Sequence, residues 1–75
     1  MPMQTSEKSL VHIVLSALEK SPYFVRRRPH VEEKSGHVVI RGTVPTFFLK
    51  QMAQETLRRI DGVEQIENQL QVLVD

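Results

Sequence analysis

Two stretches of the chain decide its fold: GHVVIRGTV at residues 36–44 and IDGVEQIENQLQV at residues 60–72. Apolar side chains recur at even-numbered positions in both stretches: Val38, Ile40 and Val44, then Ile66, Leu70 and Val72. The residues between them are mostly polar. A period of two residues is typical of a strand with one face buried and the other in water. Each stretch therefore predicts one strand of a half-exposed sheet.

A further strand is predicted before the first glycine. Residues 26–34 are mostly polar, and because Pro29 cannot donate a hydrogen bond to a ladder, this segment suits the edge of a sheet. Residues 34–37 contain Gly36, which supplies the positive φ that a two-residue hairpin turn requires. We therefore expect the two segments to form an antiparallel hairpin.

Two amphipathic helices complete the predicted fold. The first has Thr5 or Ser6 as its N-cap and ends at residues 21–22, because proline disfavours helical geometry in the residue before it. Its apolar face is formed by Leu10, Val11, Val14, Leu15, Ala17 and Leu18. The second helix begins after Thr46 and is terminated by Asp61-Gly62. Its inner face is formed by Leu49, Met52, Ala53, Thr56, Leu57 and Ile60.

These elements predict an α+β fold with the order α-β-β-α-β. Because a helix separates the last two strands, the last strand should run parallel to one member of the hairpin. The product is a three-stranded mixed sheet with both helices packed on one face. The open face should display Glu32, Lys34, Val39, Arg41, Thr43, Glu67, Gln69 and Gln71. We expect a single domain over residues 1–75, with its core at about 6–74.

The motif G-x-V-x-I-x-G-x-V, followed by a helix and I-x-G-V-x-x-I-x-N-x-L-x-V, resembles the BON family of bacterial osmotically induced and nodulation-type domains. The motif residues present are Gly36, Gly42, Ala53, Gly62, Val63 and Asn68. The resemblance implies an accessory module that binds phospholipid surfaces or other proteins and has no known catalytic centre. Gly36 and Gly62 are expected to have structural roles. We expect Gly42 to let a helix approach the sheet and Asn68 to hydrogen-bond the backbone at a bend.

Composition excludes several classes of function. The 75 residues contain no cysteine, which excludes disulfides and cysteine-ligated zinc. No stretch approaches the ~20 consecutive apolar residues of a membrane-spanning helix. The chain starts without the basic and apolar segments of a secretory signal. We therefore expect a cytoplasmic location, or a periplasmic one if the chain is a piece of an exported precursor.

The net charge of +1 hides an uneven distribution. Residues 23–60 carry eight Lys or Arg and three Glu, whereas residues 61–75 carry four acids and no base. The basic segment also contains aromatic residues, a combination that suits lipid headgroups. The candidate contact residues are Arg26, Arg27, Arg28, Lys34 and Arg41 for phosphate or acidic groups, with Tyr23 and Phe47 as apolar contacts. The alternative is a solvated strand entrance whose arginines pair with neighbouring acids.

Aromatic residues occur at two places within this segment. We expect the ring of Phe24 to join Tyr23 in an exposed aromatic surface before the arginines. On the second helix, Phe48 is expected near the buried face, beside Met52. Phe47 either folds back over the start of the helix or is exposed as an anchor for a partner.

Neither catalysis nor metal binding is expected. No hydroxyl lies in a nucleophile motif, and Glu32 and Glu33 face opposite sides of a strand. His30 and His37 would lie near each other across the hairpin with Glu32 nearby, but no chelating His pair is present, so we expect no metal and no cofactor. Nucleic acid is also an improbable partner, because the chain lacks the G-x-x-G loop of KH domains.

The sequence therefore predicts a non-catalytic binding module whose partner is an anionic phospholipid surface. The alternative is a protein-interaction or self-association module, weakly dimeric, that uses the open sheet face or a free edge. In that alternative, Val39 and Leu73 are the apolar contact points.

Overall fold

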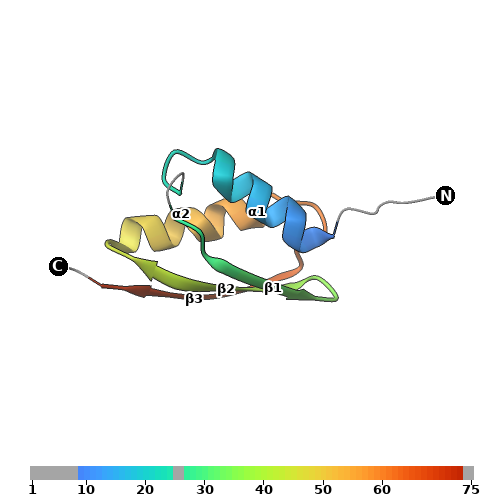
Figure 1. The fold of residues 1–75 in the computed structure, drawn as a ribbon. Coiled ribbons are helices and arrows are strands. Elements are labelled where there is room, and N and C mark those ends of the chain that lie inside the picture. The colour runs from blue at the N-terminus through green and yellow to red at the C-terminus, as the bar shows by residue number, and fades with distance from the viewer. Residues whose placement is uncertain (1–8, 25–26, 74–75) are drawn as a thin grey trace.

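The computed structural model describes residues 9–24 and 27–73 and confirms the predicted α+β fold (Figure 1). The elements are α1 (Leu10–Lys20), β1 (His30–Lys34), β2 (His37–Val44), α2 (Phe47–Arg58) and β3 (Gln65–Val72). The two helices form one layer and the sheet forms the other, with both helices on the same face of the sheet. Neither described helix is long and apolar enough to cross a membrane.

The three strands are ordered β1-β2-β3, so β2 is central and the other two are edges. β1 and β2 pair antiparallel through a two-residue loop, Ser35-Gly36, in which φ is 52° and 87°. Two successive positive φ values define a type I′ turn, whose twist matches that of the flanking strands. β2 and β3 pair in parallel, and α2 provides the crossover that parallel pairing requires.

Side-chain caps begin both helices. Thr46 is the N-cap of α2 as predicted, and its Oγ1 accepts a hydrogen bond from the backbone N–H of Leu49 at 3.1 Å. The described N-cap of α1 is Ser9, whose Oγ accepts from the N–H of His12 at 3.2 Å. The caps predicted at Thr5 and Ser6 lie outside the described residues.

The prediction that Asp61-Gly62 terminates α2 is wrong. The helix ends at Arg58, with Arg59 as its C-cap. Gly62 belongs to a separate turn, in which the N–H of Val63 donates to the carbonyl of Ile60 at 3.2 Å. This turn packs against the hairpin, because the carbonyl of Gly36 accepts from the N–H of Glu64 at 2.8 Å. A Cβ on Gly36 would lie 3.1 Å from the carbonyl oxygen of Gly62, so this close approach requires glycine.

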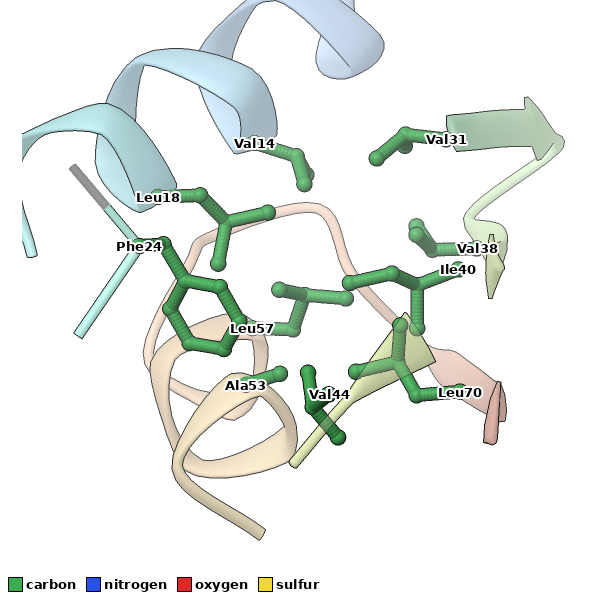
Figure 2. Packing of buried hydrophobic residues seen from close by; sticks show 10 residues of the cluster. All are labelled: Val14, Leu18, Phe24, Val31, Val38, Ile40, Val44, Ala53, Leu57 and Leu70. Carbon is green, nitrogen blue, oxygen red and sulfur yellow. The ribbon is translucent and has the colours of Figure 1, made fainter. Parts of the chain in front are cut away.

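The hydrophobic core lies between the helices and the inner face of the sheet (Figure 2). Its buried side chains are Val14, Leu18, Phe24, Val31, Val38, Ile40, Val44, Ala53, Leu57 and Leu70. These include the even-numbered strand residues Val38, Ile40 and Leu70, as the period of two predicts. The expectation that Phe24 is exposed is wrong, since its side chain is only 1% exposed. After α1 the chain turns back, with the N–H of Phe24 donating to the Ser21 carbonyl, and the ring lies beside Leu18 in the core.

Leu57→Ala should lower the free energy of unfolding by about 2 to 5 kcal/mol, because it opens a cavity in a small core. Leu73→Ala is the matched control: it deletes the same atoms from a residue that is 57% exposed and should cost well under half as much. Urea unfolding followed by circular dichroism measures both values. Equal losses for the two variants would contradict the assigned core.

Candidate functional site

The structure does not bring all the predicted contact residues together. Arg27 and Arg28 lie in the segment that joins α1 to β1, and both are exposed. Lys34 lies at the hairpin end of β1, about 13 Å along the strand from its first residue at ~3.3 Å per residue. Arg41 lies in the middle of β2 on the open face. Arg26 lies outside the described residues.

Four exposed apolar side chains gather at the end of the molecule where α2 begins; we call this group the aromatic end. It consists of Tyr23, Phe47, Phe48 and Leu73. Tyr23 and Phe48 pack edge to face, with ring centroids 5.2 Å apart and an interplanar angle of 81°. The N–H of Leu73 donates to the carbonyl of Val44, three residues before Phe47. The C-terminal ends of β2 and β3 therefore lie beside the start of α2 (Figure 1).

Within the aromatic end, Phe47 is 74% exposed. This exposure favours the prediction that Phe47 anchors a partner over the prediction that it folds back over the helix start. The expected burial of Phe48 is wrong, because 53% of it is exposed. Its ring contacts Tyr23, which is itself at the surface. The sequence signal was the pair of adjacent aromatics in the first turn of a helix, of which at most one can face the core.

The basic residues beside this end have few acidic partners. Arg28 makes a 3.5 Å ion pair with Glu19 of α1, but its side chain is 87% exposed, so water screens the pair. Arg27 makes no ion pair with any of the described residues. The two guanidiniums are therefore accessible to an anionic partner.

The open sheet face displays the predicted polar residues, and several of its charged side chains are paired with one another. Glu32 accepts from His30 at 2.9 Å and lies 3.4 Å from Arg41. Arg41 Nε also donates to Gln69 at 2.9 Å, and Gln69 donates to Glu67. A shallow hollow of about 440 Å³ lies over this face and includes Val39 in its lining. Arg41 is therefore less free to bind an external anion than Arg27 or Arg28.

His30 and His37 do not meet across the hairpin. In the ladder His30 lies opposite Arg41, whereas His37 lies opposite Lys34 at the other end of β1. His37 instead lies 3.2 Å from Glu67 of β3. Within the described ranges, no group of three or more histidines and acids is placed to hold a metal ion.

Asn68 joins β3 to α2. Its side-chain amide donates to the carbonyl of Lys50 at 2.9 Å, and its Oδ1 accepts from the N–H of Leu70 at 3.2 Å. The amide thus hydrogen-bonds the backbone, as expected, but it connects two elements and does not mark a bend. Gly42 differs from expectation, because the atoms nearest to it belong to Leu70 and Pro29 and not to a helix.

The surroundings of Glu32 shift the pKa of its carboxyl. The hydrogen bond from His30 holds the pKa of the Glu32 carboxyl below its ordinary value, and the charge of Arg41 lowers it further. A carboxyl with a lowered folded pKa stabilises the fold above its unfolded pKa. That stabilisation is lost as the pH falls through the folded pKa.

His30→Ala should raise the pKa of Glu32 towards its ordinary value, and Arg41→Gln should raise it by less, because the hydrogen bond is the larger cause. Carbon-detected NMR titration of the carboxyl measures each pKa. Arg58→Gln is the matched control, since Arg58 pairs with Glu55 on α2. An unchanged Glu32 pKa in the first two variants would show that the network does not persist in solution.

Comparison with known proteins agrees with this arrangement. The BON domain family model matches residues 6–73, a range that includes both helices and all three strands. The comparison with curated proteins gave no match. BON domains are in general non-enzymatic modules to which phospholipid binding is ascribed. Because the match extends over nearly the whole chain and the order of elements agrees, the chain belongs to the BON domain family.

Proposed function

We propose that the chain is a single-domain, non-catalytic module that attaches to anionic phospholipid surfaces through the aromatic end. One observation carries this proposal: among the described residues, Tyr23 and Phe48 pack ring against ring at the surface. Arg27 and Arg28 line a hollow together with Val44, whose carbonyl accepts from the N–H of the exposed Leu73. Aromatic rings next to cationic side chains match the layered chemistry of a membrane interface.

Neither part of this surface is sufficient alone. Two basic residues near an anionic bilayer contribute about 1 kcal/mol each, which gives weak adsorption. Removing roughly 80 Å² of apolar ring surface from water contributes about 2 kcal/mol per ring. The combination gives useful affinity, and only its electrostatic part is screened by salt.

The runner-up function is self-association through the free edge of β3. β1 is short, follows Pro29 and contains three charged residues, features that protect an edge from pairing. β3 has eight residues, of which only Glu67 is charged, and contains neither lysine nor proline. The side chain of Asn68 nevertheless occupies the N–H of Leu70, so this edge is partly satisfied within the monomer.

In a vesicle sedimentation series, the protein should bind phosphatidylglycerol-rich vesicles and not purely zwitterionic ones. Replacing Arg27 and Arg28 together by Gln should weaken binding roughly 30-fold, at about 1 kcal/mol per charge. The charge-matched control is Lys34→Gln with Arg58→Gln, which alters residues outside the aromatic end and should change binding much less. Binding that ignores lipid charge and both pairs of substitutions would exclude the proposal.

Phe47→Ala should weaken vesicle binding roughly 30-fold and reduce the part that resists salt, because the ring, at about 2 kcal/mol, inserts between headgroups. Ile13→Ala is the control, since it shortens an exposed apolar side chain outside the aromatic end. Equal effects of the two variants would contradict insertion. Absence of vesicle binding together with a concentration-dependent dimer in sedimentation velocity would favour the β3 edge.

A further inference from the structure

We propose that a hollow beside the aromatic end binds a phosphate group, and that on a membrane this group is the phosphodiester of an anionic lipid. The hollow has a volume of about 360 Å³. It is lined by Phe24, Arg27, Arg28, Pro29, Gly42, Thr43, Val44 and Leu70. That the hollow binds a phosphate group follows from its geometry. That this phosphate belongs to a lipid rests on the proposed function.

The hollow exists because β1 is shorter than β2. The ladder between them ends at the pair His30 and Arg41, so residues 42–44 of β2 extend beyond β1. Pro29 has no N–H with which to continue the ladder, and the chain leaves the sheet there. The space that a longer β1 would fill is therefore open.

The uncovered part of β2 presents a hydrogen-bond donor to this space. The two-residue hairpin makes Lys34 and His37 a hydrogen-bonded pair, so the backbone groups of odd-numbered β2 residues face β1. The carbonyl of Val44 faces the other way and accepts from the N–H of Leu73. The N–H of Thr43 therefore points towards the hollow, and it has no backbone partner among the described residues.

The side chains around this donor suit an anion. Arg27 and Arg28 line the hollow, and their planar guanidiniums match the geometry of phosphate oxygens. Gly42 adds no side chain to the floor, and its φ of 146° disfavours any other residue there. None of the described residues that line the hollow is acidic. Arg27, Arg28 and the Thr43 N–H, which has no backbone partner among the described residues, thus border one space. An anion there would compete with the long, exposed pair between Arg28 and Glu19.

The position of the hollow favours a lipid over free phosphate. Val44 lines the hollow and also bonds to Leu73 of the aromatic end. A phosphate held there would lie at headgroup level when the aromatic rings enter the bilayer. The geometry thus places the charged part of a lipid next to the apolar anchors.

Proton-nitrogen NMR titration tests the inference with three probes: inorganic phosphate, glycerophosphoglycerol and phosphatidylglycerol vesicles. We expect glycerophosphoglycerol to shift the Thr43 amide resonance saturably. Arg27→Gln with Arg28→Gln should weaken this binding by roughly tenfold or more, and the same positions changed to Lys should restore part of it. Lys34→Gln with Arg58→Gln should leave the Thr43 response unchanged.

The outcomes separate the two proposals. If no soluble probe shifts Thr43 saturably, the phosphate site is excluded, even if vesicles bind. If Thr43 responds to glycerophosphoglycerol but the protein ignores vesicles, the phosphate site stands and the membrane function falls. If only inorganic phosphate shifts the Thr43 resonance, the assignment of the ligand to a lipid phosphodiester is wrong. A further outcome is that the Arg27→Gln, Arg28→Gln variant and the Lys34→Gln, Arg58→Gln variant weaken glycerophosphoglycerol binding equally. That result would also overturn the site, since it would indicate general charge attraction.

Discussion

The parallel pairing of β2 with β3 is the constraint on which the rest of the structure depends. Two consecutive strands in this relation cannot be joined by a tight turn, so α2 must carry the chain back across one face of the sheet. That face becomes the core, and Ala53 and Leu57 of α2 are fully buried against it. The other face has no cover, and its polar residues remain in water.

The same crossover explains why the exposed aromatic residues gather at one end. β2 and β3 run in the same direction and finish side by side, with the N–H of Leu73 bonded to Val44. α2 begins only two residues after β2, so its first turn lies at that end as well. Phe47 and Phe48 are therefore carried to the place where the chain also turns after α1, and Tyr23 meets Phe48 there.

Electrostatics separates the two polar surfaces. On the open face, Glu32, Arg41 and Glu67 belong to one hydrogen-bonded network across three strands, so an external ion would have to displace internal partners. Beside the aromatic end, the contact of Arg28 with Glu19 is long and exposed. An accessible cation that lacks a strong partner gains more from an external anion than one already paired. This difference is the physical basis for placing the anion site at Arg27 and Arg28.

The order of the elements, the faces of the strands and several of the signals at their ends follow from the printed residues. The alternation around Ile40 and Leu70, the cap at Thr46 and the turn at Gly36 act over a few residues, and each has a direct physical cause in the local backbone. For the same reason, the half-exposed sheet with helices on one face could be predicted from the printed residues alone.

Which side chains contact one another depends on the packing of the helices and strands. The burial of Phe24 and the exposure of Phe48 depend on how the turn after α1 packs against α2. The separation of Lys34 and Arg41 from Arg27 depends on strand register. The N–H of Thr43 has no backbone partner among the described residues, because β1 leaves the sheet before reaching it. Contacts between distant segments follow from the packing of whole elements, and no local pattern encodes that geometry.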